Sequence, residues 1–266
     1  YLEATANTNH ATPNSQIPLT IEVINRSNIQ IVLESIKINK EVINEHLELK
    51  NNQDQSIKDT LKISKNQKPT TPYWLMQKGT LGMYRVDNPE LIGLPETPAA
   101  AVDFNLLVDG EPITISKPVI YKTNNPVKGE TYKPFVVIPE VSAKFAENVI
   151  IFDNDSQKQI PVIVKASKDN VEGYVSIAHP KDWSVYPEKQ AISIAHKGED
   201  QTIVFTVIPP KNQSEGLITP MVHIGDNIYT KKLIDIDYEH IPFQTVLLPS
   251  ESKVVRLNIK KKGNNI

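Results

Sequence analysis

Short runs of alternating apolar and polar residues dominate this chain. The clearest runs have apolar residues at every second position: Leu19, Ile21 and Val23, then Val102, Phe104, Leu106 and Val108, and then Ile203, Phe205 and Val207. A period of two places these side chains on one face of a strand, as in half-buried antiparallel sheets. Helix-type periodicity is nearly absent, so the pattern predicts an all-β protein.

Turn residues separate these runs. Asp109-Gly110 lies between two apolar runs, and Gly225-Asp226-Asn227 lies between two later ones. Both sequences suit the positive φ angles of a hairpin turn, which would join neighbouring strands antiparallel. Twenty prolines and ten glycines are also typical of many short strands joined by turns. Strands at such short intervals, without intervening helices, predict two immunoglobulin-like antiparallel β-sandwich domains in tandem.

A polar stretch that ends in Pro126 divides the chain almost evenly, because the strand pattern breaks there. The predicted first domain covers residues 1–125 and carries a long irregular loop at about 68–98, rich in proline and glycine. The second domain covers residues 126–241. Residues 242–266 are predicted to form a C-terminal strand or a linker to a domain absent from this chain.

Composition excludes several classes of function. The formal net charge is -2, from 29 basic and 31 acidic residues, so no overall field attracts nucleic acid. Cysteine is absent, which removes disulfides, thiol nucleophiles and cysteine zinc sites. No apolar stretch is long enough to span a membrane. Since the sequence does not begin with methionine, we expect it to be part of a longer polypeptide.

No pattern in this chain indicates catalytic, metal-binding or cofactor-binding residues. The histidines are scattered singly, without the paired spacing that places two imidazoles on one metal ion. Neither a nucleophilic serine elbow nor a glycine-rich phosphate loop occurs. Asp153 with Asp155, and Asp235 with Asp237, share one strand face and are expected to be solvated. We therefore predict that this chain is not an enzyme by itself.

Part of the second half resembles the sandwich domain that accompanies α-galactosidases. The resemblance lies in three stretches: Pro180-Lys181-Asp182-Trp183-Ser184-Val185-Tyr186-Pro187, Lys197-Gly198-Glu199 and the strand from Ile203 to Pro210. In such a domain Trp183 would fill the space between the two sheets as a core residue. Residues Ala178 to Asp182 also look like a degraded form of the zinc signature of LmbE-type deacetylases, but Lys181 replaces its first aspartate, and we interpret this match as accidental.

The whole chain resembles the region downstream of the catalytic domain in large bacterial LmbE/PIG-L-type deacetylases. The matching stretches are Leu2-Glu3-Ala4-Thr5-Ala6, Ile24-Asn25-Arg26-Ser27, Pro72-Tyr73-Trp74-Leu75, Pro126-Val127-Lys128-Gly129-Glu130 and Tyr132-Lys133-Pro134. The resemblance implies that zinc and the hydrolase activity belong to a separate α/β domain of the parent protein. It also implies an extracytoplasmic location, periplasmic or secreted.

Two functions follow as hypotheses. The first is a non-catalytic structural or interaction module that spaces or supports the catalytic domain, with other domains of the same polypeptide as its partners. The second is a carbohydrate-binding module in which Tyr73, Trp74 and Tyr84 of the irregular loop contact a glycan. The alternative for Trp74 is that it covers one end of the first core.

Overall fold

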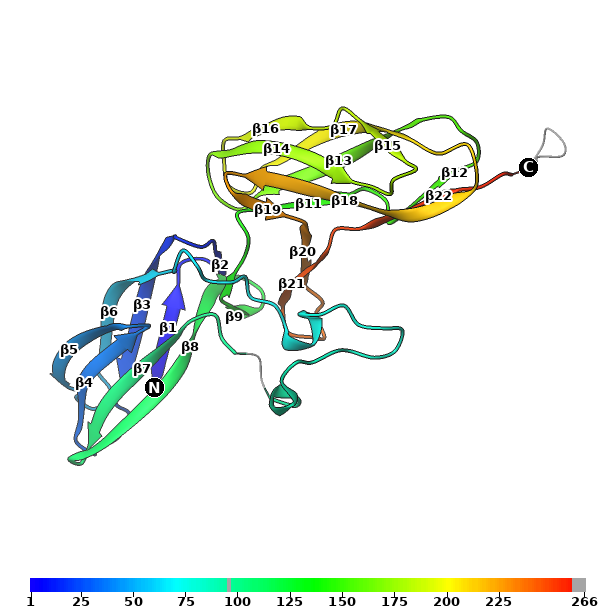
Figure 1. The fold of residues 1–266 in the computed structure, drawn as a ribbon. Helices are drawn as coiled ribbons and strands as arrows, with labels where there is room; N and C mark the ends of the chain where they lie inside the picture. Colours follow the sequence, from blue (N-terminus) through cyan, green and yellow to red (C-terminus); the bar gives the residue numbers. More distant parts are fainter. Residues whose placement is uncertain (95–96, 260–266) are drawn as a thin grey trace. The chain divides into compact units, whose positions relative to one another are not determined.

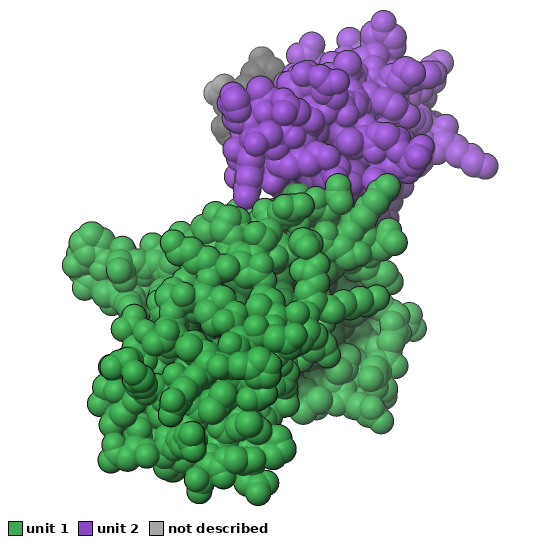
Figure 2. Space-filling view, turned by 90° about the vertical axis from the view of Figure 1, so that its left-hand side faces the viewer, with its two compact units in different colours: residues 1–138, 235–246 green, residues 139–234, 247–266 purple. Residues whose placement is uncertain are grey.

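The computed structural model describes residues 1–94 and 97–259, and it is all-β, with two short 3-10 helices as its helical elements in that part of the chain. The chain forms two compact units (Figures 1 and 2). Unit 1 comprises Tyr1–Ile138 and Asp235–Val246, and unit 2 comprises Pro139–Ile234 and the chain from Leu247 onward. The predicted all-β class with two sandwich domains is confirmed.

Unit 1 is built on one continuous sheet whose strand order is β5-β4-β7-β8-β1-β3-β6, with β9 also paired to β8. Its elements are β1 (Leu2–Ala6), β2 (His10–Ala11), β3 (Gln16–Ile24), β4 (Ile31–Ile38), β5 (Glu41–Glu48), β6 (Asp54–Lys62), η1 (Tyr73–Leu75), η2 (Pro89–Leu91), β7 (Ala101–Val108), β8 (Glu111–Asn125), β9 (Gly129–Pro134) and β10 (Val136–Val137). A short parallel pair, β2 with β10, lies beside this sheet.

The sheet folds into a sandwich at the long strand β8, which pairs with strands of both layers. Residues Glu111–Pro118 pair with β7, whereas Val119–Tyr121 pair with β1 and Ile120–Asn125 pair with β9. The core between the layers includes Leu33 and Phe104 from one side and Ile21 and Leu61 from the other, all fully buried. The predicted face of Leu19, Ile21 and Val23 is therefore an inner face.

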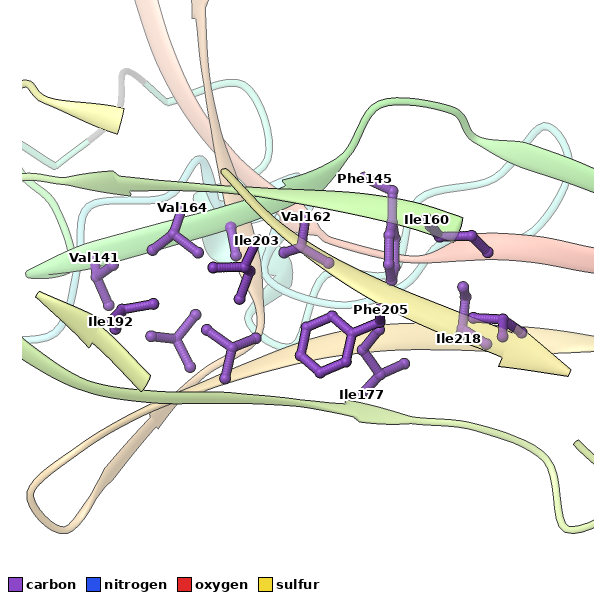
Figure 3. Packing of buried hydrophobic residues seen from close by; sticks show 14 of the residues in the cluster. Val141, Phe145, Ile160, Val162, Val164, Ile177, Ile192, Ile203, Phe205 and Ile218 are labelled. Atoms are coloured by element: carbon purple, nitrogen blue, oxygen red, sulfur yellow. The ribbon is translucent and has the colours of Figure 1, made fainter. Parts of the chain in front are cut away.

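Unit 2 is a sandwich of two separate sheets, with the orders β11-β13-β17-β15 and β12-β22-β18-β14-β16. Its strands are β11 (Val141–Phe145), β12 (Val149–Phe152), β13 (Lys158–Ala166), β14 (Val171–Ala178), β15 (Ser184–Tyr186), β16 (Gln190–Ile194), β17 (Asp200–Ile208), β18 (Ser214–Ile224), β19 (Asn227–Tyr229) and β22 (Ser252–Arg256), with β19 paired to β18. Figure 3 shows side chains of both sheets, among them Val164, Phe205 and Ile218, pointing into the common interior.

Trp183 lies between the two sheets of unit 2, as predicted. Its side chain is 1% exposed and packs edge-to-face on Phe152, with ring centroids 5.1 Å apart. The indole N–H donates to Ser214 Oγ at 3.2 Å, and that hydroxyl donates to Asp182 Oδ2 at 2.5 Å. These contacts give Asp182 a structural role next to the core tryptophan.

The boundaries of the two units differ from the predicted domain boundaries. The polar stretch before Pro126 is the last part of β8 and leads into the β8–β9 turn at residues 126–128, where the Asn125 side chain accepts hydrogen bonds from the backbone N–H groups of Val127 and Lys128. Unit 1 therefore continues to Ile138. The predicted C-terminal strand or linker from residue 242 contains two strands, β21 (Gln244–Pro249) and β22, and β22 pairs with β12 and β18 inside unit 2.

Residues Asp235–Val246 return to unit 1 through charged and aromatic contacts. They begin within the last two residues of β20 (Lys231–Ile236), which pairs with β21 in a two-stranded sheet. Lys133 Nζ lies 3.6 Å from Asp237 and 3.9 Å from the centre of the Phe243 ring, and Lys128 Nζ lies 3.1 Å from Glu239. The strand pairs β1–β8, β2–β10 and β12–β22 are parallel, where only antiparallel pairing was predicted.

Alkaline pH is expected to destabilise unit 2 through Tyr229. Burial, together with the neighbouring Glu140 carboxylate, raises the pKa of Tyr229 to about 12, above the ordinary value of 10.0. Between these values the unfolded chain releases the phenolic proton while the folded chain keeps it, so the free energy of unfolding falls as pH rises. Urea unfolding at pH 8 and pH 11 should show a smaller alkaline loss for Tyr229→Phe. An equal loss in both proteins would contradict this assignment.

Candidate interaction surface

The irregular segment between β6 and β7 is held firmly at its base. Thr70 donates its backbone N–H to Val137 O at 2.7 Å, and the Thr70 hydroxyl accepts the Val137 N–H at 2.9 Å. On the other side, Gln67 Nε2 donates to Ala99 O at 2.9 Å. The two ends of the segment are thereby attached to the sandwich of unit 1.

Internal contacts order the rest of the segment. Gly93 donates its backbone N–H to the Tyr73 hydroxyl at 3.2 Å, which links η1 to the chain that follows η2. The Asn88 side chain caps η2 by accepting the Glu90 N–H at 3.1 Å. Gln77 donates to the Asp87 carboxylate across the segment. In Figure 1 the segment loops away from the strands of unit 1 and carries both 3-10 helices.

A tight turn at Thr80–Met83 presents Leu81 at its tip. Thr80 and Met83 exchange two backbone hydrogen bonds, of 2.9 and 3.3 Å, and Gly82 has a φ of +87°, which favours glycine. The Leu81 side chain is fully exposed, at 107% of its reference area. We use the name apolar tip segment for residues 76–94, whose large exposed apolar side chains are Met76, Leu81, Met83, Tyr84, Ile92 and Leu94.

The apolar tip segment is unusual because its order does not come from burying its apolar side chains. Folding normally removes such side chains from water, at about 25 cal/mol per Å² of apolar area. Here hydrogen bonds and turns hold the backbone while the apolar groups face solvent. Several large exposed apolar side chains within one short segment make it a candidate interaction site.

A small cavity lies at the base of the segment. Its volume is about 200 Å³, and its lining is mostly apolar and rich in proline: Pro72, Pro98, Pro118 and Pro134 with Phe135, Val119, Ile120, Val136, Ala99, Thr70, Thr97, Gln244 and Thr245. A cavity of about this size accommodates a single aromatic ring. It is too small for most substrates or cofactors.

The three aromatic residues predicted to contact a glycan lie in this region but do not form one flat surface. The Tyr73 and Trp74 rings are 4.9 Å apart and perpendicular, at 89°. Both are partly buried, while Tyr84 is 68% exposed. Sugar binding by Tyr73, Trp74 and Tyr84 stays a prediction. Sequence reasoning missed Met76, Leu81 and Met83, although Leu81-Gly82-Met83-Tyr84 is an apolar run inside a turn-rich segment.

Two other residues considered from the sequence, His179 and Asp235, make contacts within the fold. His179 Nδ1 lies 2.9 Å from Pro180 O, and Asp235 accepts a hydrogen bond from the Thr245 hydroxyl at 2.6 Å. Within residues 1–94 and 97–259, no group of three or more histidine and acidic side chains is placed to hold a metal ion. None of the helices in this part of the chain has the length and hydropathy needed to cross a membrane.

No family model and no curated protein matches the chain. Among solved structures, the chain is similar to alpha-2-macroglobulin from Escherichia coli, at 11% identity and a TM-score of 0.33, covering 97% of this chain and 16% of that one. A mutant Salmonella alpha-2-macroglobulin is similar at 12% identity and a TM-score of 0.33, covering 96% and 16%. A Porphyromonas gingivalis protein of unknown function has 8% identity and a TM-score of 0.22, covering 96% of each chain. This chain thus spans about a sixth of the macroglobulins, and similarities this distant carry no property over to it.

Proposed function

We propose that this chain is a non-catalytic interaction module of a larger extracytoplasmic deacetylase of the LmbE/PIG-L type, and that it supports the catalytic domain of that protein. The observation that carries the proposal is the apolar tip segment, whose backbone is ordered while Leu81, Met83 and Tyr84 are largely exposed. An ordered apolar surface binds a partner without the entropy cost of first fixing a flexible loop. The resemblance of the sequence to the downstream region of these deacetylases supports the choice of partner.

The mode of binding follows from the shape of the segment. Leu81 at the turn tip, flanked by Met83 and Tyr84, can enter a pocket of the partner, while methionine side chains adapt to an irregular surface. The charged residues of the segment include both signs, Lys78 and Arg85 with Asp87 and Glu90. Affinity is therefore expected to come from apolar burial and to depend only weakly on salt.

Replacing Leu81 and Met83 by aspartate tests this proposal. Binding of the isolated chain to the separately produced catalytic domain, measured by isothermal titration calorimetry, should weaken at least about 30-fold, since two apolar contacts of roughly 1 kcal/mol each are lost. Val127→Asp is the matched control, because Val127 is 91% exposed in the β8–β9 turn of the same unit. The proposal fails if both variants bind as tightly as the unchanged chain, or if the unchanged chain does not bind.

A carbohydrate-binding module is the second candidate, favoured by the exposed ring of Tyr84. Tyr84→Ala should then abolish binding on a glycan array while the protein stays folded. Retained glycan binding in Tyr84→Ala would exclude this residue, and no binding by the unchanged chain would exclude the candidate itself.

A further inference from the structure

The edge strand β12 of unit 2 has backbone groups along one side that do not pair with another strand of its sheet. In its parallel pairing with β22, the carbonyl groups of Asn148 and Phe152 accept from Lys253 and Leu257, at 2.8 and 2.9 Å. Backbone groups alternate in direction along a strand, so those of Val149 and Ile151 face away from β22. Strand β12 is the terminal strand of its sheet among residues 1–94 and 97–259.

The side chains of this edge are apolar on both faces. Ile150 and Phe152 are buried in the core, whereas Val149 and Ile151 are 49% and 50% exposed on the outer face. The outer face continues across the sheet, because Ile151 pairs with Val255, and Lys253, the neighbour of Val149, pairs with Leu217. An added strand would therefore find hydrogen-bonding groups and the exposed side chains of Val149 and Ile151 beside it, while the ion pair of Lys253 with Glu215 lies further across the same face.

A cation and a cavity lie at the same edge. Lys158 Nζ donates to the outward carbonyl of Ile151 at 2.7 Å and lies 5.4 Å from the centre of the Phe152 ring. Beside it is a cavity of about 160 Å³, lined by Ala146, Glu147, Ile150, Ile151, Lys158, Gln159, Ile160 and Pro161. The cavity is large enough for one aliphatic side chain.

Four other edges in the described part of the chain, on β8, β5, β6 and β11, carry protecting features. On β8 the N–H of Val119 donates to Ala100 O on the β7 side, so the backbone groups of Pro112 and Pro118 face the opposite side. Proline has no N–H, and these two residues therefore offer no donor to an added strand. Strands β5 and β6 carry several charged side chains each. The outward carbonyl of Ala143 on β11 accepts from the Ser250 hydroxyl at 2.6 Å. By contrast, Val149–Phe152 has no charge and no proline of its own.

We propose that β12 binds an extended segment of a partner polypeptide by strand addition, and that this segment alternates aliphatic residues and carries one carboxylate. The segment pairs with the backbone of Val149 and Ile151 and places an aliphatic side chain in the adjacent cavity. Its carboxylate attracts Lys158, whose ammonium group leaves the Ile151 carbonyl and thereby frees that acceptor. Lys158 thus occupies the outward carbonyl of Ile151 when no segment is bound.

Charge favours a partner segment over a second copy of this chain. Antiparallel pairing of β12 with β12 of a second copy would bring two Lys158 ammonium groups to one edge, which costs free energy. A segment with a carboxylate compensates the same charge. This site lies in unit 2 and does not depend on the proposed role of the apolar tip segment in unit 1.

The test uses a blocked octapeptide, acetyl-Ser-Val-Thr-Ile-Glu-Val-Thr-Ser-amide, and a matched peptide with lysine in place of glutamate. Titration of the full chain by nuclear magnetic resonance should show binding of the glutamate peptide and slowed amide exchange at Val149 and Ile151. The lysine peptide should bind at least about tenfold more weakly, since a charge-assisted contact of roughly 1.4 kcal/mol becomes a repulsion.

Ile151→Pro is the decisive variant, because the N–H that it removes faces away from β22 and the pairing of β12 with β22 keeps its hydrogen bonds. It should weaken binding of the glutamate peptide about tenfold, through one lost hydrogen bond and a blocked edge. Val204→Thr, at a similarly exposed position on the other sheet, is the control and should bind normally. The proposal is overturned if neither peptide binds, if Ile151→Pro binds as well as the control, or if the chain forms a dimer that Ile151→Pro abolishes, which would assign the edge to a second copy.

Discussion

Replacing Trp183 by alanine should reduce the free energy of unfolding of unit 2 by about 3 to 5 kcal/mol, the usual cost of removing a fully buried tryptophan. The indole fills the space between the two sheets, and its ring contacts Phe152. Its loss creates a cavity and also leaves the Ser214 hydroxyl without the indole N–H that it accepts. Urea unfolding followed by far-ultraviolet circular dichroism measures the change.

Two variants make this test specific. Trp183→Phe keeps an aromatic ring in the core and should cost clearly less than Trp183→Ala. Trp74→Ala makes the same chemical change at a half-buried position of unit 1 and should leave the unfolding of unit 2 unchanged. A loss below about 1 kcal/mol for Trp183→Ala would mean that the sheets of unit 2 pack without this side chain.

Gly173→Ala is expected to destabilise unit 2 by about 3 kcal/mol, at the upper end of the cost of overpacking. A Cβ atom at residue 173 would lie 2.0 Å from the backbone O of His223 and 2.8 Å from Ile224 Cδ1. Because the first obstacle is backbone, β14 and β18 would have to separate. The close approach also lets the Tyr174 ring stack on the His223 ring, with centroids 4.4 Å apart.

The neighbouring variant Glu172→Ala is the control for Gly173→Ala, because Glu172 is exposed on the same strand and should change stability by less than about 0.5 kcal/mol. Thermal unfolding of the two variants gives the comparison. Equal melting temperatures would show that β14 can shift at no cost, contrary to the packing described for Gly173.

Local patterns predicted the strands and turns well, because alternation and turn chemistry act over a few residues. Leu19, Phe104 and Phe205 are all buried, and Asp109 and Gly110 both have positive φ, as a tight hairpin turn requires. The core position of Trp183 was predicted from the resemblance of residues 180–187 to the sandwich domain that accompanies α-galactosidases, and the side chain is 1% exposed.

Organisation at longer range was not predictable. A polar stretch with a proline has the same appearance in a domain linker as in the β8–β9 turn, so the boundary near residue 125 differed from the one at Ile138. The return of Asp235–Val246 to unit 1 depends on contacts such as Lys133 with Phe243, which are more than 100 residues apart. The need for glycine at residue 173 likewise arises from a neighbouring strand.

The candidate surface was predictable only in part. The proline and glycine content predicted the irregular segment between β6 and β7, but exposure of Leu81 and Met83 follows from the turn at Gly82 and from the hydrogen bond between Tyr73 and Gly93. This hydrogen bond brings together residues 20 positions apart. The aromatic residues of the segment were predicted from the sequence to contact a ligand, whereas its most exposed side chain, that of Leu81, is aliphatic.

The most direct test of the proposed supporting role compares the proposed parent deacetylase with a version that lacks residues 1–266 of this chain. Deacetylase activity and the melting temperature of the catalytic domain would be measured for both proteins under the same conditions. If this chain supports the catalytic domain, both values fall on deletion, and adding the separate chain restores part of the loss. Unchanged activity together with an unchanged melting temperature would contradict the account.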